Sequence, residues 1–201
     1  MATFLVWAIK YLNYKLNGLR LRIIILWLRM QGVQVGKSVY IGKNVEFFLS
    51  PGAKLILRDH VIIFNHSTVT VNSGAILDIG KGVLFNHHGN IACGTNIVIG
   101  ENCAFGPYCT LIDVDHRYRD ITVPVPSQRG VYAGIRIESG VWAGTNAIML
   151  RGIHLGKHCV IGAGAVVKSN IPAYSLAVGV PAKVVKTFDP SYEHQAPAPI
   201  S

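Results

Sequence analysis

The sequence has few charged side chains and no acidic residue near its N-terminus. Only 14% of the 201 residues are charged and 50% are hydrophobic, which excludes a disordered chain and predicts a large interior or a wide subunit interface. Seven basic residues precede the first acid, Glu46; they are Lys10, Lys15, Arg20, Arg22, Arg29, Lys37 and Lys43. A nucleic-acid-binding surface would mix such residues with aromatics. We therefore expect no nucleic-acid partner and, instead, contact with an anionic membrane surface.

The sequence also lacks a membrane-spanning run and a paired-cysteine motif. The longest uninterrupted apolar run near the N-terminus, Ile23–Leu28, is far shorter than the ~20 residues of a transmembrane helix. No signal-peptide cleavage site follows it, so we expect neither a transmembrane anchor nor secretion. The cysteines form no C-x-x-C pair and fall in apolar patterns, which predicts buried reduced thiols, no metal site and a cytoplasmic location. They are Cys93, Cys103, Cys109 and Cys159.

A six-residue repeat is the main feature that the sequence does contain. From Ile135 onward, apolar residues recur every six positions in two registers that lie two residues apart. The first register is Ile137, Ala143, Met149, Leu155, Ile161 and Val167, and the second is Ile135, Val141, Ala147, Ile153, Cys159 and Ala165. Residues two apart point the same way from a strand, and the next four must turn a corner before the pattern repeats.

This period predicts short parallel strands wound around an axis, with the apolar positions stacked inside. Three strands and three corners would make a triangular coil of ~18 residues. The expected corner residues suit positive φ; they are Asn44, Asn102, Gly140, Asn146 and Gly164. The register is weak over residues 47–75, slips by two residues between Ile91 and Ile99, and breaks between Leu111 and Ile135.

Two segments do not follow the repeat. Residues 112–134 are polar and contain two prolines, which predicts a loop inserted into the scaffold, a common place for chemistry. Residues 1–30 carry an apolar stripe spaced alternately by four and three: Leu5, Ile9, Leu12, Leu16, Leu19, Ile23, Leu26 and Met30. This stripe fits either an interfacial membrane helix or a seam against the β-helix or another subunit. We divide the chain into a basic helical segment (1–34), a repeat region (35–180) and a C-terminal segment with a flexible tail (181–201).

Three longer motifs together resemble one known family. They are IGENCAFGPYCTLIDVDH, VWAGTNAIMLRGIHLGKHCVIGAGAVV and AVGVPAKVV, within residues 35–186. The chain resembles the hexapeptide-repeat acyltransferases, the family of galactoside and maltose acetyltransferases and of enzymes that O-acetylate surface polysaccharides. The resemblance implies a left-handed parallel β-helix and a homotrimer with active sites between subunits. It also implies acetyl-CoA as co-substrate, and a sugar or lipid-linked sugar as acceptor.

The resemblance also implies roles for residues that carry the reaction. His116, in the inserted loop, matches the family's catalytic histidine. A neutral imidazole can accept the proton of a sugar hydroxyl as its oxygen attacks the thioester. The backbone N–H of Thr145 would stabilise the resulting oxyanion. Asn86 matches an asparagine near the pantetheine and the acyl group.

The remaining predicted site residues concern the cofactor and the acceptor. By resemblance, Ala163 contributes backbone to the pantetheine, while Lys183 and Lys186 meet the phosphates of CoA. The family usually reads VVTKD after the last coil and this chain reads VVKSN, which places Lys168 one residue early for its phosphate contact. Asp113 and Asp115, which flank the histidine, are candidates to bind acceptor hydroxyls, to orient the imidazole or to stabilise the loop.

Two other functions stay open at the level of sequence. A zinc enzyme resembling the γ-class carbonic anhydrases would need three converging histidines, and the chain offers His87, His88, His116, His154 and His158. A non-catalytic binding scaffold is the second alternative, because repeat folds often serve as surfaces.

Overall fold

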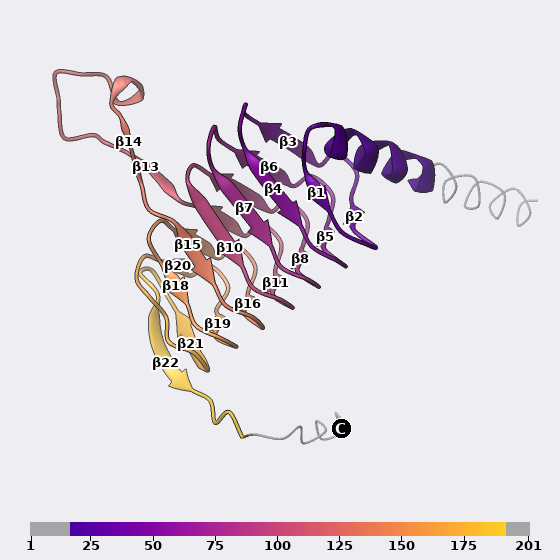
Figure 1. The fold of residues 1–201 in the computed structure, drawn as a ribbon. Coiled ribbons are helices and arrows are strands. Elements are labelled where there is room, and N and C mark those ends of the chain that lie inside the picture. Colours follow the sequence, from indigo (N-terminus) through magenta and orange to yellow (C-terminus); the bar gives the residue numbers. More distant parts are fainter. Residues whose placement is uncertain (1–16, 192–201) are drawn as a thin grey trace, which may run out of the picture.

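The computed structural model describes residues 17–191 and shows a parallel β-helix with one helix at its N-terminal end (Figure 1). The chain winds around three flat sheets, here called faces A, B and C. Neighbouring strands within each face are parallel, except at the C-terminal edge of face B. The expected left-handed parallel β-helix is confirmed.

The strands of each face follow one another at every turn of the coil. Face A contains β1 (Gln34–Val35), β4 (Lys54–Leu57), β7 (Ile76–Ile79), β10 (Asn96–Ile99), β15 (Ile135–Ile137) and β18 (His154–Leu155). Face B contains β2 (Tyr40–Ile41), β5 (Ile62–Ile63), β8 (Leu84–Phe85), β11 (Ala104–Phe105), β16 (Trp142–Ala143), β19 (Val160–Ile161), β21 (Ser175–Val178) and β22 (Lys183–Thr187). Face C contains β3 (Glu46–Leu49), β6 (Thr68–Val71), β9 (Asn90–Cys93), β12 (Thr110–Ile112), β17 (Ile148–Leu150) and β20 (Val166–Val167).

The core is a column of side chains that runs along the axis of the coil. All positions of the two predicted registers are buried, with at most 2% of each residue exposed. The largest side chains stack directly on one another: the rings of Phe85 and Phe105 lie 4.2 Å apart and nearly parallel. Full burial of such a side chain stabilises the fold by about 1.5–3 kcal/mol. The column therefore holds the coil together.

The length of the coil is not uniform, and the prediction of 18-residue coils is wrong for the N-terminal half. Lys54 pairs with Ile76, 22 positions later. Ile76 pairs with Asn96, 20 positions later, and only from β15 is the offset 18, as between Arg136 and His154. From β3 to β10 the strands on faces A and C have four residues each, whereas from β12 onward they have two or three. These longer sides explain the weak register over residues 47–75.

The corners of the coil require positive φ, and the five predicted corner residues all adopt it. Asn44, for example, has φ 53° and Gly140 has φ 74°. Several other corners use larger residues that the sequence did not mark. His66, His88 and Tyr108 occupy the same corner in successive coils, and their rings stack 5.1 and 4.7 Å apart. Stacking of this kind stabilises the corner from outside.

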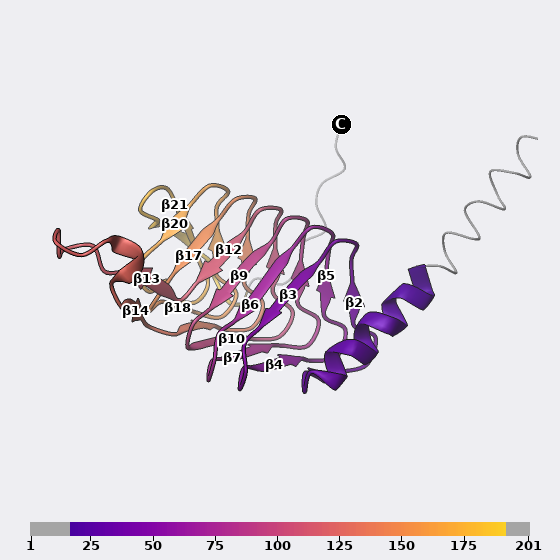
Figure 2. The same cartoon turned by 90° about the horizontal axis from the view of Figure 1, so that it is seen from above.

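The helix at residues 17–30 covers the N-terminal end of the β-helix (Figures 1 and 2). Leu28 is fully buried and Leu21 and Ile24 pack against the core, while the guanidinium of Arg20 donates to the carbonyl oxygens of Ile41 and Gly42. The predicted stripe faces away from the β-helix; its described members are Leu19, Ile23, Leu26 and Met30, each more than half exposed. A seam against the β-helix of its own chain is therefore wrong for this part of the stripe. Its earlier positions lie outside the described residues.

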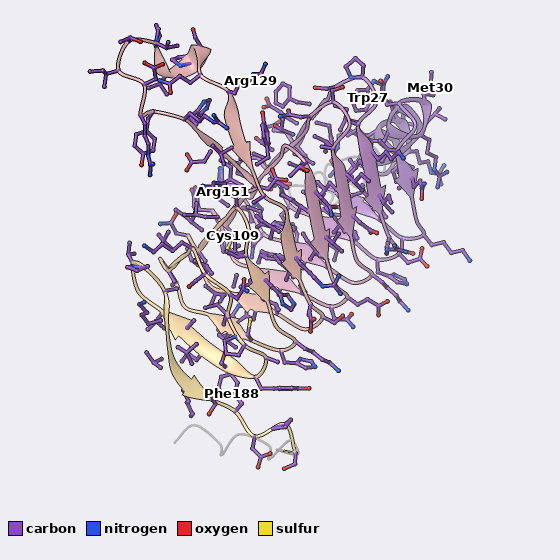
Figure 3. The ribbon with its side chains drawn as sticks, turned by 60° about the vertical axis from the view of Figure 1, so that its left-hand side comes forward. Trp27, Met30, Cys109, Arg129, Arg151 and Phe188 are labelled. Atoms are coloured by element: carbon purple, nitrogen blue, oxygen red, sulfur yellow. The ribbon has the colours of Figure 1, made fainter. Side chains whose placement is uncertain are left out.

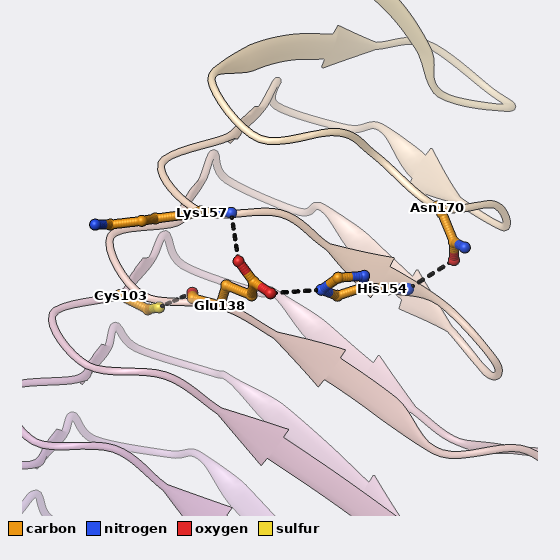
Figure 4. Close-up of polar contacts among 5 residues, drawn as sticks. All are labelled: Cys103, Glu138, His154, Lys157 and Asn170. Atoms are coloured by element: carbon orange, nitrogen blue, oxygen red, sulfur yellow. Dashed lines mark hydrogen bonds and ion pairs between the residues drawn. The ribbon is translucent and has the colours of Figure 1, made fainter. Parts of the chain in front are cut away.

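Polar side chains stabilise the outside of face A. Glu138 accepts a hydrogen bond from the backbone N–H of Lys157, and its other oxygen lies 3.0 Å from Nε2 of His154 (Figure 4). The backbone N–H of His154 donates to Oδ1 of Asn170. These contacts join three successive coils. The hydrogen bond from His154 also holds the pKa of the Glu138 carboxyl below its ordinary value.

The cysteines lie inside the coil as free, buried thiols, as the sequence predicts. Burial raises the pKa of the thiols of Cys93 and Cys159 to about 12. A thiol must lose its proton to react, so these cysteines are inert at neutral pH. None of the helices in the described part of the chain is long and apolar enough to cross a membrane.

Candidate active site

A hairpin leaves the coil between β12 and β15. It consists of β13 (Val114–His116) and β14 (Gly130–Tyr132), which pair antiparallel, and it projects well beyond the stacked coils (Figure 2). Its tip contains a short 3-10 helix, η1 (Val125–Ser127). The side-chain amide of Gln128 donates to the carbonyl oxygens of Asp120 and Val123, which ties the tip together. The insertion coincides with the loop that the sequence predicts.

Asp113 stands at the base of this hairpin and is fully buried. Its carboxylate accepts hydrogen bonds from the backbone N–H groups of Gly94, Thr95 and Asn96, which form the tight corner of the preceding coil. This corner contains only two residues between β9 and β10, which causes the slip between Ile91 and Ile99. The prediction that Asp113 binds the acceptor is wrong, because its oxygens are inside the fold and already bonded. Its role is to anchor the base of the hairpin.

His116, the predicted general base, is exposed at the end of β13. Its backbone N–H donates to Oδ1 of Asp115 at 2.8 Å, and Oδ2 of Asp115 lies 3.8 Å from Nε of Arg151. Arg151 follows β17 in the next coil and lies at the base of the hairpin (Figure 3). The sequence analysis missed Arg151. The six-residue register could have found it, because β17 pairs with β12 and so places Arg151 beside Asp113.

The hairpin and the coil beneath it enclose a hollow of about 530 Å³ next to His116. Besides the histidine, it is lined by Asp115, Arg117, Tyr118, Arg119, Asp120, Gln128, Val131 and Arg151. No described group hydrogen-bonds to the imidazole of His116. The ring is therefore free to meet a ligand in this hollow.

Three other predicted residues lie together at the corner between faces B and C. Thr145 and Ala163 follow β16 and β19, which are paired neighbours on face B. Asn86 follows β8 at the start of the same corner, two coils earlier, and its side-chain oxygen accepts the N–H of His87 at 2.8 Å. All three are at least partly exposed. The structure thus places these three residues along one edge of the β-helix, where faces B and C meet.

The backbone N–H groups of Thr145 and Ala163 have no hydrogen-bond partner among residues 17–191. At the same corner position in earlier coils, the N–H of Lys43 donates to Asn65 and that of His87 donates to Asn86. Thr145 and Ala163 therefore present two exposed, unpaired donors in successive coils. Donors of this kind can bind the carbonyl oxygen of a ligand without rearranging.

Two glycines keep these donors accessible. A Cβ atom on Gly106 would lie 2.7 Å from the nitrogen of Thr145, and one on Gly144 would lie 2.7 Å from the nitrogen of Ala163. Both distances are far below van der Waals contact. The sequence alone assigned no such role to either glycine.

The predicted lysines divide between two edges of the molecule. β22 pairs antiparallel with β21 and places Lys183 opposite Val178, which lies against Gly162 beside Ala163. Lys186 is exposed further along the same strand. Lys168 follows β20 at the opposite edge of face C, one coil beyond Leu150. It is therefore on the side of the hairpin and apart from the other two lysines.

The predicted site residues form two groups in one chain. The corner half-site contains Asn86, Thr145, Ala163 and Lys183, between faces B and C. The loop half-site contains Asp115, His116 and Lys168, together with the unpredicted Arg151, at the other edge of face C. A strand of three residues such as β17 separates the two edges by about 10 Å. One chain therefore does not bring the predicted base to the predicted oxyanion donor.

The histidines do not converge on one point. Within the described part of the chain, no group of three His, Cys, Asp or Glu side chains could hold a metal ion. His154 is bonded to Glu138, and His66 and His88 stack on each other.

Comparison with known proteins gives relatives of one kind. Residues 134–169 match the family described as bacterial transferase hexapeptide (six repeats). A protein of Mycobacterium tuberculosis named as an acetyltransferase is 37% identical over 159 residues, which cover 79% of this chain and 53% of the relative. The galactoside O-acetyltransferase of Lactococcus lactis is 32% identical and covers 60% of this chain and 59% of its own length. The chain thus spans little more than half the length of these relatives.

Other relatives are matched over a larger share of their own length. A protein of Schizosaccharomyces pombe named as an acetyltransferase is 34% identical over 66% of this chain and 67% of its own length. Among solved structures, the N-acyltransferase AntD of Bacillus cereus, in complex with coenzyme A and dTDP-4-amino-4,6-dideoxyglucose, has a TM-score of 0.68 at 19% identity, covering 81% of this chain and 88% of AntD. A maltose O-acetyltransferase of Clostridium difficile has a TM-score of 0.57 at 23% identity, with 80% and 72% covered. These structures share the fold, and the sequence relatives show that the chain belongs to the hexapeptide-repeat acyltransferases.

Proposed function

We propose that this protein is an acetyl-CoA-dependent O-acetyltransferase that acts on a sugar hydroxyl. Two relatives, named as galactoside O-acetyltransferases, support this acceptor class, and structural neighbours are complexed with coenzyme A or acetyl-CoA. The observation that carries the proposal is the pair of unbonded N–H groups at Thr145 and Ala163, on the same edge as Lys183. An extended pantetheine needs exposed backbone donors of this kind, and its phosphates need a cation.

The chemistry follows from the two half-sites. The imidazole of His116 accepts the proton of the sugar hydroxyl as the oxygen attacks the thioester carbonyl. The N–H of Thr145 stabilises the negative charge that develops on the carbonyl oxygen. When the carbon–sulfur bond breaks, the protonated imidazole returns its proton to the departing sulfur, so that the products are the sugar ester and CoA. Asp115 and Arg151 hold the end of β13, and with it His116, in place.

This reaction requires a second copy of the chain, because one protomer holds its two half-sites on different edges. When one copy's loop half-site meets the next copy's corner half-site, the contact is between two different surfaces. Such heterologous contacts form a closed ring when the rotation from one copy to the next divides a full turn. The homotrimer implied by the family resemblance is the smallest ring of this kind, and it contains three complete sites.

The outer side of face B supplies an apolar surface for this contact. Each strand of the face except β22 has one outward-pointing residue between two buried ones, and these residues form a ladder along the axis of the coil: Tyr40, Ile62, Leu84, Ala104, Trp142, Val160 and Leu176. None of them is charged, and Trp142 is 57% exposed. Subunit interfaces are rich in aromatic and aliphatic side chains of this kind. This ladder ends beside the corner half-site.

We further propose that the helix at residues 17–30 docks on an anionic membrane surface. Its outward stripe of Leu19, Ile23, Leu26 and Met30 is 56–76% exposed, and Trp27 is 43% exposed beside it. The exposed basic residues Arg22 and Arg29 flank this face, and no acid occurs before Glu46. An interfacial helix has this combination of an apolar face and cations. Docking would hold the enzyme at the inner membrane surface, where a lipid-linked sugar is accessible.

Membrane docking predicts salt-sensitive binding to vesicles. The protein is expected to co-sediment with vesicles that contain phosphatidylglycerol and not with neutral vesicles, because each basic residue near anionic lipid adds about 1 kcal/mol. The double variant Ile23→Glu, Leu26→Glu should abolish co-sedimentation. The control is Ile121→Glu, at an even more exposed apolar residue that lies on the hairpin instead of the helix. If the native protein does not bind vesicles and the double variant changes the size of the oligomer, the helix forms contacts between subunits instead.

The proposed function is tested most directly by measuring acetyl transfer. Purified protein with acetyl-CoA is expected to release CoA only when a sugar acceptor is present, and mass spectrometry should find the acceptor heavier by one acetyl group. A panel of free sugars, nucleotide sugars and lipid-linked sugars identifies the acceptor class. If CoA binds but no sugar or other hydroxyl compound is acetylated, the scaffold alternative is favoured.

A further inference from the structure

The hollow beside His116 is lined by more basic than acidic side chains, and binding a neutral sugar does not require this excess. Three arginines, Arg117, Arg119 and Arg151, line the hollow beside His116, against the two acids Asp115 and Asp120. Arginine side chains bind carboxylate and phosphate groups through paired, charge-assisted hydrogen bonds. The arrangement of these five charged side chains therefore indicates whether the acceptor carries a negative charge.

Both acids of the hollow are already engaged by their own chain. Asp115 accepts the N–H of His116 and faces Arg151. Asp120 accepts hydrogen bonds from the N–H and the hydroxyl of Thr122 at 3.0 and 2.6 Å. These bonds hold the pKa of the Asp120 carboxyl below its usual value, so this acid remains charged but is turned toward the loop. Neither carboxylate neutralises Arg117 or Arg119.

Arg117 and Arg119 have no ion pair or hydrogen bond from their guanidinium groups to any part of the chain within residues 17–191. Both lie within three residues of His116 on the chain and line the same hollow. Tyr118 lies between them with 66% of its surface exposed. The hollow thus offers two unpaired guanidinium groups and an aromatic ring next to the proposed base.

We infer that the acceptor is an acidic sugar, and that Arg117 and Arg119 bind its carboxylate or phosphate group while His116 meets a hydroxyl. This inference rests on the proposed function and names the substrate class of the same site. The anion fixes the position of the sugar in the hollow, so that one hydroxyl lies beside the imidazole. A neutral sugar enters the same hollow without this anchor.

The test compares acceptors that differ in charge and share their hydroxyl groups. Hexuronic acids are paired with their methyl esters, and hexose 1-phosphates are paired with the corresponding methyl glycosides. The charged member of a pair is expected to have a kcat/KM at least about tenfold higher, because a charge-assisted hydrogen bond is roughly twice as strong as a neutral one and two guanidinium groups would contribute such bonds. Whether the carboxylate or the phosphate pair shows the larger ratio identifies the anion.

The variant Arg117→Gln, Arg119→Gln should reduce this preference to near unity, mainly through a higher KM for the charged acceptor. The affinity for acetyl-CoA, measured by calorimetry, should not change. The matched control is Arg129→Gln, at another arginine of the hairpin that does not line the hollow (Figure 3); it should keep the preference. Calorimetric titration with the same acceptor pairs, without acetyl-CoA, reports on the anion site independently of turnover.

Three outcomes would overturn the inference. The native enzyme could use both members of each pair equally, or the double variant could keep the preference. The double variant could also weaken CoA binding instead, which would assign the arginines to the cofactor's phosphates. If no sugar is acetylated but the acidic sugars still bind and the double variant abolishes binding, the anion site stands and the proposed reaction fails.

Discussion

Replacing His116 with alanine should lower the rate of acetyl transfer by at least about a hundredfold, the usual contribution of a general base. The imidazole is exposed and makes no hydrogen bond to any group of residues 17–191. The fold and the affinity for acetyl-CoA are therefore expected to stay as they are. Steady-state rates, with circular dichroism and calorimetry as checks, measure all three properties.

A matched control is available for this substitution. His158 is also an exposed histidine, but it lies at the corner between faces A and B, where its ring packs against Tyr174. His158→Ala should keep its activity. If His116→Ala turns over at a near-normal rate, the proton must be accepted by another group and the assignment of the base fails.

Replacing Thr145 with proline should lower the rate by about a hundredfold to a thousandfold, because it removes the proposed oxyanion donor. Proline fits this corner: Pro107 occupies the same position one coil earlier, and the N–H of Asn146 bonds to the carbonyl of Pro107 in either case. Thr145→Ala is the matched variant, since it removes the side chain and keeps the N–H. It should lose far less activity than the proline variant.

These two inactive variants also test how the site is assembled. In a ring, each site combines the loop half-site of one copy with the corner half-site of the next. Co-expressed His116→Ala and Thr145→Pro chains, purified through two different tags so that every trimer contains both, should regain activity at about one third of the sites, because a mixed ring of three has one junction with both intact half-sites. If the mixed protein stays inactive, each chain holds its own complete site, and the proposed assembly is wrong.

The β-helix could be predicted from sequence because its core repeats locally. Residues such as Ile137 and Ala143 are buried for the same reason in every coil, so the period alone gives the fold. The length of the N-terminal coils could not be predicted, because four-residue strands such as β4 interrupt the period of six without any turn signal. The length of a coil depends on which strands pair with each other, and this pairing joins residues that are about 20 positions apart in the sequence.

The site was predicted in part. The position of His116 in an inserted loop and the backbone roles of Thr145 and Ala163 came from motifs, and the structure places them on exposed edges. The burial of Asp113 could not be foreseen, because its partners at Gly94 and Thr95 belong to the preceding coil. The division into two half-sites also depends on which corner each residue occupies, and this requires the true coil lengths.

The shortening of the coil from 22 to 18 residues has a consequence for how copies stand beside one another. Faces A and C lose about two residues each, or about 7 Å of width, while the strands of face B from β2 to β19 have two residues each. The chain is thus a tapered prism, broad at its N-terminal end. When such prisms stand in a ring with parallel axes and touch at their broad ends, slots open between their narrow ends. Thr145, Ala163 and Lys183 line that end, so in the proposed ring the taper would leave room between subunits for a long, thin ligand.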